Sequence, residues 1–541
     1  MISDICNFYS NKNIFITGAT GLLGKVLIEK YLRACHGLDG IYILMRQKKG
    51  KSAKERSDEY ISDPIFSLNG LKQSGVCNKI YPIFGDTSQP GFGINDSDRQ
   101  LLIDRINVVI HVAATVKLHS PLRYAVEHNV RPIISLIELC HQIKQLDCLT
   151  YVSTTAILNG TKYCNERIHP LELITPEQVI KACDNCTDKE LNKLEKMFFH
   201  EFNNTYCISK VLAEQLLHRE RDWLRICVVR PSAILTSNAE PEPGWVQGIQ
   251  GTSSAILAIG IGLMKVFPSR RLGAQVVIPV DFVANAIIAG VWYLTTKSAD
   301  NIQVYHLTTN SDYSPSMRFI MKLVRQNSLK YPSKRVIRPP YGLVYPKNKL
   351  QLFIEIYIKH WIYAYILDFG AKLFGVQTKL LKITNKMNET MKDIRRFMKT
   401  CPEYETTNTF ALIDQMSVTD RLLFCFDIRQ IDWQVYCETM WSGLKRHLLN
   451  EGQEDEDVIK AKKILQKVSF KYHILNTCWL IFLSLLLYFI GYLMCDLIGL
   501  DYFLPSMSTI VSPSSTMDFV RIVILVVSLV FGYNFFDTIV L

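Results

Sequence analysis

A glycine-rich turn between a predicted strand and a predicted helix constrains the fold of this chain more than any other feature. Residues 13–17 (NIFIT) are β-branched and aromatic, residues 18–24 read GATGLLG, and a helical stretch follows to Cys35. Glycines at this spacing let the backbone turn tightly and let a pyrophosphate approach the helix N-terminus without an intervening Cβ. The pattern therefore predicts a nucleotide-binding strand–turn–helix unit.

Apolar runs alternate with helical stretches through the following part of the chain. Runs rich in valine and isoleucine recur at the spacing of β–α units, at residues 41–45, 79–86, 107–114, 148–154, 224–230 and 303–309. Runs of this kind indicate strands that are buried on both faces, as in a parallel sheet covered by helices on each side. We predict an α/β fold built on a Rossmann-type, doubly wound parallel sheet.

The end of the second predicted strand carries a base where many dinucleotide sites carry an acid. Arg46 stands about 20 residues beyond the last glycine of the turn. Residues 47–51 add three lysines. An acid at this place usually binds the ribose hydroxyls of NAD, whereas an arginine suits a 2′-phosphate. The sequence therefore favours NADPH over NADH, and the alternative is a solvated basic loop.

Residues 206–210 (YCISK) place a phenol and an ammonium group four residues apart at the start of a predicted helix. Residues at this spacing lie on one helix face, so both groups can face the same cleft. A phenol with a pKa near ~10 is a poor acid or base at neutral pH, and a nearby lysine would lower that pKa. We predict Tyr206 and Lys210 as catalytic residues; the alternative is an ordinary pair on a helix surface.

Three hydroxyl side chains follow the fifth predicted strand. They are Ser153, Thr154 and Thr155. A hydroxyl at this place could hydrogen-bond a substrate oxygen. The residues alone leave open which of the three does so.

Two apolar runs near the C-terminus predict a membrane segment over residues 474–541. Residues 474–495 (ILNTCWLIFLSLLLYFIGYLMC) carry no formal charge. At about 1.5 Å per residue they span roughly 33 Å, enough for one transmembrane helix. Residues 519–540 could form a second helix that crosses or re-enters the bilayer. The alternative for each run is a buried core helix.

The charges around the first apolar run predict its orientation. Five lysines precede it, Lys460, Lys462, Lys463, Lys467 and Lys471. Residues 496–518 carry three aspartates and no lysine or arginine. The positive-inside rule then puts the large N-terminal part in the cytosol, and the first residues lack the apolar core of a signal peptide. We expect an intracellular membrane, endoplasmic reticulum or peroxisome, with the catalytic domain facing the cytosol.

Composition excludes several classes of protein. With 48% hydrophobic and 21% charged residues the chain is not disordered. The net charge of +11 is spread along the chain, so no nucleic-acid partner is expected. Its 15 cysteines should be reduced thiols in the cytosol. Cys183 and Cys186 lack a second pair at zinc spacing, so we expect no metal site.

Together with further motifs, these features resemble an extended short-chain dehydrogenase/reductase and, more narrowly, an alcohol-forming fatty acyl-CoA reductase with a sterile-type C-terminal domain. The further motifs are residues 229–232 (VRPS), 242–245 (EPGW), 279–285 (PVDFVAN) and the spaced aspartates and aromatics of 420–443. The resemblance implies an NADPH-binding domain over 1–315 with an embedded substrate subdomain. It also implies a mainly helical domain over 316–460, followed by the membrane segment.

The resemblance also implies roles for particular residues. It points to Thr154 as the active hydroxyl, with Ser153 and Thr155 still open, and it places Asp86 against the adenine and Ala113 and Ala114 beneath the ribose. The full set of expected cofactor-binding residues is Thr17, Gly18, Thr20, Gly21, Leu22, Leu23, Gly24, Arg46, Asp86, Ala113, Ala114, Tyr206, Lys210 and Pro231.

The implied reaction is the NADPH-dependent reduction of a long-chain fatty acyl-CoA to a primary alcohol and CoA. It takes two hydride transfers through an aldehyde, and a homodimer is possible. Departures from the family pattern at residues 129–132, 155–158 and 245–248 leave the acyl-chain preference open. One alternative is another membrane-anchored reductase of the same superfamily, acting on a sterol or a nucleotide sugar. The other is an inactive lipid-binding or scaffold protein.

Overall fold

The computed structural model describes most of the chain. The described residues are 3–47, 50–118, 120–157, 163–171, 174–198, 204–249, 251–267, 277–309, 315–373, 379–399, 402–452 and 454–497. They form two compact units. The first comprises Met1–Leu257, Pro268–Asn327 and Lys379–Gly452, and the second comprises Ala258–Phe267, Ser328–Thr378 and Gln453–Leu541. Residues 316–460, which the resemblance groups as one domain, are therefore divided between the two units.

A seven-stranded sheet forms the centre of the first unit, and all of its strands run parallel. In spatial order its strands are β3 (Ile80–Phe84), β2 (Gly40–Met45), β1 (Asn13–Thr17), β4 (Val108–His111), β5 (Cys148–Val152), β7 (Ile226–Pro231) and β10 (Ile302–Leu307). The chain order reverses between β1 and β4, which is where sheets of this type bind ligands. The predicted Rossmann-type parallel sheet is confirmed.

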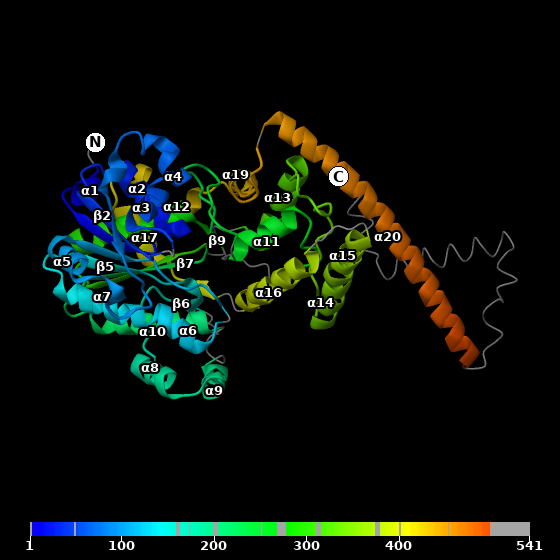
Figure 1. The fold of residues 1–541 in the computed structure, drawn as a ribbon, viewed down its shortest axis with the longest axis horizontal. Helices are drawn as coiled ribbons and strands as arrows, with labels where there is room; N and C mark the ends of the chain where they lie inside the picture. Colours follow the sequence, from blue (N-terminus) through cyan, green and yellow to red (C-terminus); the bar gives the residue numbers. More distant parts are fainter. Residues whose placement is uncertain are drawn as a thin grey trace. The chain divides into compact units, whose positions relative to one another are not determined.

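Helices cover both faces of this sheet (Figure 1). On one face, α2 (Leu22–Ala34) packs against α12 (Val280–Thr296). On the other, α6 (Leu122–Asn129), α7 (Arg131–Gln142) and α10 (Thr205–Arg219) pack together. Because β1, β2, β4, β5 and β7 are buried along their whole length, their sequences are nearly continuous apolar runs.

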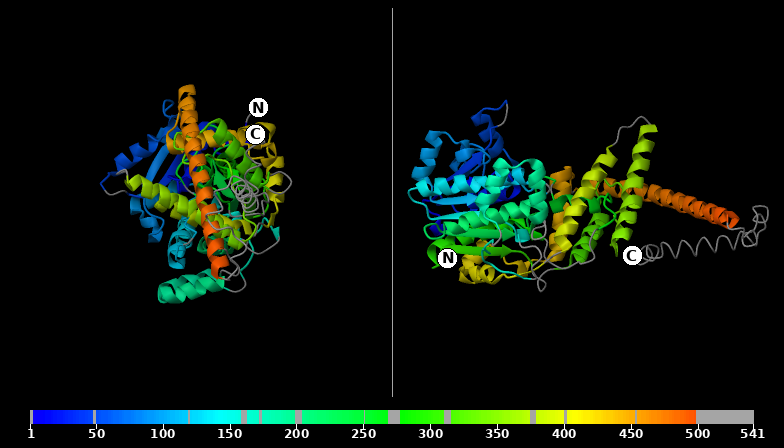
Figure 2. Two further views of the ribbon diagram at one scale, coloured as in Figure 1. Left: turned by 90° about the vertical axis from the view of Figure 1, so that its right-hand side faces the viewer. Right: turned by 90° about the horizontal axis from the view of Figure 1, so that it is seen from below.

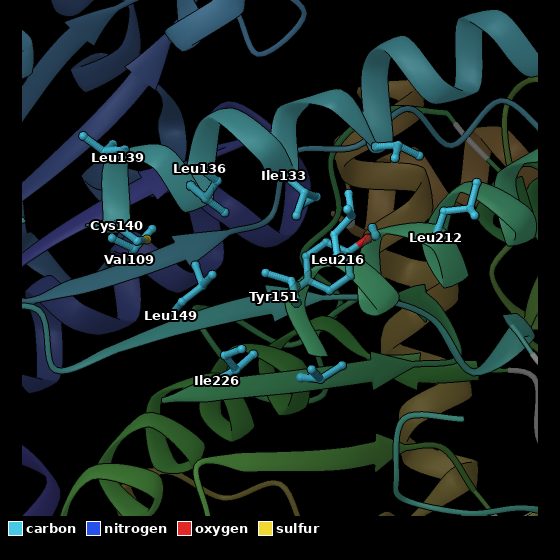
Figure 3. Packing of buried hydrophobic residues seen from close by; sticks show 14 of the residues in the cluster. Val109, Ile133, Leu136, Leu139, Cys140, Leu149, Tyr151, Leu212, Leu216 and Ile226 are labelled. Carbon is cyan, nitrogen blue, oxygen red and sulfur yellow. The ribbon is translucent and has the colours of Figure 1, made fainter. Parts of the chain in front are cut away.

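The second face holds a large part of the hydrophobic core. In Figure 3, Ile133, Leu136 and Leu139 of α7 lie over the sheet residues Val109 and Leu149. These five side chains are fully buried. Burial of large aliphatic side chains is the main stabilising term in a fold of this kind. This packing fixes α7 and α10 against the strands whose ends carry the candidate site.

Further helices and two small strand pairs complete the first unit. The helices are α1 (Asp4–Phe8), α3 (Ala53–Ile61), α4 (Pro64–Ser67), α5 (Asp96–Arg105), α8 (Pro176–Asn185), α9 (Asp188–Phe198), α16 (Leu380–Lys399), α17 (Thr407–Gln415), α18 (Val418–Leu423) and α19 (Trp433–Gly443). Two small parallel pairs join β6 (Tyr163–Cys164) to β11 (Glu403–Tyr404) and β8 (Ala233–Leu235) to β9 (Val277–Pro279). Helices α11 (Gly251–Gly260) and α13 (Met317–Lys330) lie at the boundaries of the two units.

Residues from the C-terminal part of the first unit pack on its nucleotide-binding part. The hydroxyl of Tyr436 on α19 donates to the carbonyl oxygen of Thr236 at 3.0 Å. The side chain of Glu166 accepts the hydroxyl of Thr409 on α17 at 2.6 Å and the backbone N–H of His306 on β10 at 2.7 Å. The contacts of Tyr436 and Thr409 join residues about 200 positions or more apart in the sequence. The first reaches the segment after β7, and the second lies at β10, the edge strand of the sheet.

The second unit is mainly helical. It contains α14 (Lys349–Ile356), a π-helical turn (Tyr357–Ile362), α15 (Tyr363–Leu373) and the 43-residue α20 (Asp455–Leu497). Figure 2 shows α20 as one continuous helix. The buried Arg338 donates to the carbonyls of Gly262 and Leu263 and lies 4.2 Å from the ring centre of Tyr363 on α15. The same tyrosine ring contacts Tyr472 of α20.

The membrane prediction falls on α20 and on the chain beyond it. Among the described residues, no helix combines the length and the apolar character that crossing a bilayer requires. Residues 474–495 lie within α20, and the predicted transmembrane helix is not confirmed there. The predicted second segment, residues 519–540, lies outside the described residues.

Candidate active site

The glycine turn follows β1 and leads into α2. Gly18 has a positive φ of +76°, and a Cβ on it would lie only 2.6 Å from the backbone nitrogen of Ala113. A Cβ on Gly24 would meet the carbonyl oxygen of Gly18. The helix begins at Leu22 with Gly21 as its N-cap residue, and no side chain caps it. The sequence needs glycine here because the turn, the following helix and the loop after β4 approach one another closely.

The loop after β4 is fixed to the end of β1 by a buried threonine. The side-chain oxygen of Thr17 lies 2.9 Å from Nδ1 of His111 and accepts the backbone N–H of Ala113 at 3.3 Å. Burial lowers the pKa of His111 to about 3, so its ring is neutral at pH 7. The fold therefore brings together Thr17, Gly18 and Ala113, three of the residues expected at the cofactor.

A cavity of about 610 Å³ opens at the carboxyl ends of β2 and β3. Arg46 and Asp86, both predicted from the sequence, line it. Arg56 of α3 also lines it and was missed by the sequence reasoning. Its Nη1 donates to Glu59 at 2.7 Å, while its buried Nε has no hydrogen-bond partner among the described residues. A buried donor of this kind fits an anionic ligand group.

Helix α10 and the end of β5 bring the predicted catalytic groups together. Asn204 caps α10 by accepting the backbone N–H of Cys207 at 2.9 Å, which starts the helix one residue before Tyr206. The hydroxyl of Thr154 lies near the phenol of Tyr206 and lowers the pKa of that phenol. One turn along, Nζ of Lys210 donates to the carbonyl oxygen of Val152 at 2.7 Å. Tyr206, Lys210 and Thr154 thus meet at the carboxyl end of β5.

The three candidate hydroxyls differ in their contacts. Thr154 lies near Tyr206 and lowers the pKa of its phenol, and Oγ1 of Thr154 accepts the backbone N–H of Ala156 at 3.3 Å. The hydroxyl of Ser153 is buried and makes no hydrogen bond within the described part of the chain. Thr155 is buried at the start of a 3₁₀ turn. Thr154 therefore has the geometry that an active hydroxyl needs.

The electrostatics of the pair differ from the expectation. Burial raises the pKa of the Tyr206 phenol above its ordinary value, and the nearby hydroxyl of Thr154 opposes that rise only in part. Burial also lowers the pKa of Lys210 to about 7. The predicted lowering of the phenol pKa by a charged lysine is thus absent in the protein alone. Desolvation outweighs the attraction between charges because Lys210 is itself buried, with the centre of the Tyr151 ring 4.6 Å from its Nζ.

A buried asparagine that the sequence reasoning did not single out links the two halves of the site. The side chain of Asn129 accepts the backbone N–H of Thr115 at 2.8 Å and donates to the carbonyl oxygen of the same residue. It also donates to the hydroxyl of Ser209 at 2.9 Å. The asparagine therefore holds the loop after β4 against the catalytic helix. The only signal for Asn129 in the sequence is its position in the segment 129–132 (NVRP).

Pro231 is the last residue of β7 and thus lies at the carboxyl edge of the sheet. The residue before it, Arg230, is fully buried and bonds to both carboxylate oxygens of Glu214 on α10, at 3.0 and 2.6 Å. A paired, hydrogen-bonded arginine of this kind is a structural contact between strand and helix. It fixes α10 to β7 one helical turn beyond Lys210.

Comparisons with known proteins agree with this geometry. Two family models described as male sterility protein match the chain: an NAD-binding model over residues 16–287 and a Sterile model over residues 359–451. Fatty acyl-CoA reductase 1 of Rattus norvegicus is 32% identical over 464 residues, covering 86% of this chain and 89% of that protein. Fatty acyl-CoA reductase 2 of Mus musculus is 32% identical over 477 residues, covering 88% and 92%.

A solved structure shares the fold. The crystal structure of the terminal R domain from the myxalamid PKS-NRPS biosynthetic pathway superposes with a TM-score of 0.51 and 19% identity, covering 80% of this chain and 90% of that one. With the family models and the two reductases, the relationship is clear over most of the chain. The chain belongs to the fatty acyl-CoA reductase family and is an oxidoreductase.

Proposed function

We propose that this protein reduces long-chain fatty acyl-CoA to a primary alcohol and CoA, with NADPH as the reductant. The observation that carries the proposal is the meeting of Tyr206, Lys210 and Thr154 at the carboxyl end of β5, on the ligand-binding edge of the sheet. The names of the relatives, fatty acyl-CoA reductases 1 and 2, support the substrate class.

The residues present fit a dinucleotide. The backbone at Gly18 and Gly24 leaves no room for a side chain, which suits close approach of a pyrophosphate to the N-terminus of α2. Two arginines, Arg46 and Arg56, line the same cavity, and the second keeps a buried donor unused within the described residues. Two guanidinium groups suit a 2′-phosphate, which supports NADPH over NADH.

The cofactor would supply hydride to the thioester carbonyl and again to the aldehyde. Tyr206 and Thr154 would hold the carbonyl oxygen by two hydrogen bonds, which strengthen as negative charge develops on that oxygen. In the first reduction the hemithioacetal collapses to the aldehyde and the CoA thiolate. In the second, Tyr206 donates its proton to the alkoxide, and the ammonium form of Lys210 returns a proton to the phenolate.

The direct test is Tyr206→Phe, assayed for fatty alcohol in a membrane preparation with long-chain acyl-CoA and NADPH. We expect a loss of roughly a hundredfold or more, because the proton donor is removed while the ring is kept. Tyr124→Phe is the matched control, since Tyr124 lies on α6 and its hydroxyl accepts a hydrogen bond from Nζ of Lys117 at 3.2 Å. Undiminished alcohol formation in Tyr206→Phe would refute the proposal.

We also infer that the protein works at an intracellular bilayer, in the endoplasmic reticulum or the peroxisome, with the reductase unit in the cytosol. The support is the basic stretch before residue 474 and the apolar run of residues 474–495. Protease treatment of intact organelles tests this orientation. Cytosolic exposure predicts digestion of the first 450 residues or so without detergent, whereas protection of that part would reverse the assignment.

A further inference from the structure

The second unit exposes a continuous row of large apolar side chains along α14 and α15. We call this row the apolar stripe, and its members are Leu350, Phe353, Ile354, Tyr357, Tyr365, Ile366 and Phe369. Leu350 and Phe353 are 69% and 68% exposed. Isolated exposed hydrophobic residues are ordinary on protein surfaces, whereas a contiguous row of them marks an interaction surface.

Helical spacing puts the stripe on one face. Each member lies three or four residues from another member on its side of the π-helical turn, and a step of eight residues from Tyr357 to Tyr365 crosses that turn. Leu352, His360 and Ala364 point to the opposite side and are buried in the unit. The rings stack in pairs along the exposed side, Phe353 on Tyr357 and Tyr365 on Phe369.

Exposed lysines lie at both ends of the apolar stripe. Lys347 and Lys349 are exposed before its first member, and Lys372 is exposed after its last. The two acids of the same helical stretch are only partly exposed, and one of them, Glu355, is paired with Lys359 at 3.1 Å. An apolar face with tyrosines along it and lysines at both ends matches the interface of an anionic bilayer.

We propose that the apolar stripe is a membrane-docking surface that lies in the plane of an anionic lipid bilayer. This inference rests on the proposal that the enzyme works at a bilayer and names the surface that contacts it. The aromatic and aliphatic side chains enter the boundary between headgroups and acyl chains, while Lys347, Lys349 and Lys372 extend to the lipid phosphates and carboxylates.

The surface of α20 also supports an anionic bilayer as the partner of this unit. Tyr363 of α15 contacts Tyr472 of α20, and the five lysines between Lys460 and Lys471 of α20 are exposed. Phe470 and Ile474 of that helix are also exposed. Basic and apolar side chains thus also occur on the surface of α20, whose Tyr472 contacts Tyr363 of α15, as expected for a unit that faces an anionic lipid surface.

Photolabelling of the full chain tests the proposal. The protein is bound to phosphatidylcholine vesicles that contain a phosphatidylserine with a diazirine in its acyl chain, and it is irradiated and digested with trypsin. Cleavage after Lys349, Lys359 and Lys372 releases the whole stripe in two peptides, residues 350–359 and 360–372. We expect lipid adducts on both peptides, and fewer when the vesicles hold the diazirine lipid without net negative charge.

Substitutions in the apolar stripe separate its contribution to lipid labelling from that of any other part of the chain that contacts the membrane. Tyr365→Asp should lower adduct formation on residues 350–359 several-fold, because it puts an unpaired charge into the stripe. Leu422→Asp is the matched control: Leu422 is 80% exposed on α18 of the first unit, outside the stripe. The control variant should label like the parent. Phe369→Ser provides a second, milder change of the same surface.

Two results would overturn the inference. Adducts confined to the peptide that begins at Tyr472 would mean that the chain binds the bilayer through its C-terminal run and not through the stripe. Chemical cross-links between stripe peptides of two chains, without lipid adducts, would assign the surface to a second copy. If the vesicles bind no protein at all, the proposed bilayer partner fails together with the stripe, while the reductase assay with Tyr206→Phe stays unaffected.

Discussion

At the scale of single residues, burial decides the protonation of the catalytic groups before any ligand arrives. The pKa of Tyr206 is raised and that of Lys210 is lowered to about 7, each mainly by desolvation. A neutral phenol beside the hydroxyl of Thr154 is ready to donate a proton. A lysine with a pKa near neutrality can give a proton and take one back at physiological pH, which suits the role of replenishing that phenol.

The assignment of Thr154 as the active hydroxyl can be tested by comparing substitutions of Thr154 and of its neighbour Ser153. Thr154→Val should reduce alcohol formation by roughly tenfold to a thousandfold, because it removes a hydrogen bond to the carbonyl oxygen of the substrate. Ser153→Ala should leave the rate within about twofold, because its hydroxyl has no partner among the described residues. Initial rates of alcohol formation by both variants check this, and a larger loss in Ser153→Ala would move the active hydroxyl to Ser153.

The two arginines predict the cofactor preference. Arg46→Ala and Arg56→Ala should each weaken NADPH binding by roughly tenfold or more while leaving NADH binding almost unchanged, because a lost bond to a charged group costs about 1.5–3 kcal/mol. Fluorescence titration of both cofactors gives the ratio of the two Kd values. An unchanged ratio in both variants would remove the 2′-phosphate from this cavity.

Sequence reasoning was most effective at this scale where a motif fixes local geometry. Tyr206 and Lys210 share a helix face because of their spacing, and Arg46 follows a strand at a set distance from the glycines. Arg56 was missed because it reaches the cavity from the next helix, after a loop whose path no spacing rule gives. The electrostatics were mispredicted because desolvation depends on every atom packed around the site.

At the scale of elements, the edge of the sheet is held by a carboxyl group that should make stability depend on pH. Glu166 accepts N–H and O–H groups from β10 and α17. Burial nevertheless raises the pKa of Glu166 from 4.5 to about 7. Below pH 4.5 the group is protonated in both the folded and the unfolded state; as pH rises toward 7 the unfolded chain ionises first, so the folded state loses stability.

Glu166→Gln isolates this effect because it keeps the shape and removes the ionisation. The free energy of unfolding of the parent, relative to the variant, should fall by up to about 3 kcal/mol between pH 4.5 and 7. Urea unfolding of the parent and the variant at several pH values measures this difference in free energy. The titration of the neighbouring groups His306 and Glu405 affects both proteins and therefore cancels in the difference. A difference that is constant with pH would show that the pKa of Glu166 is the same in the folded and the unfolded chain.

The strands were predictable at this scale because parallel strands buried on both faces leave nearly continuous apolar runs. The contact between Glu166 and Thr409 was not predictable, since it joins positions far apart in sequence by ordinary polar residues. The same holds for the short pair of β6 and β11, whose two-residue strands carry no periodic pattern.

At the scale of the whole molecule, the chain folds back on itself in a way that linear domain boundaries do not capture. Residues 379–452 belong to the first unit, while residues 328–378 and the long α20 belong to the second. The contact between Tyr436 and Thr236 is one of the bonds that bring the later segment back. The resemblance to a family indicated the order of the segments, but only long-range packing determines which segments share a core.

The number of NADPH molecules consumed for each fatty alcohol formed tests the central claim most directly, namely that one site carries an acyl-CoA through an aldehyde to the alcohol. The measurement combines absorbance at the nicotinamide band with product chromatography, with Tyr206→Phe as the blank. The account predicts about two NADPH per alcohol and no aldehyde release, because each of the two reductions takes one hydride. A ratio near one, or NADPH consumption without any alcohol, would contradict it.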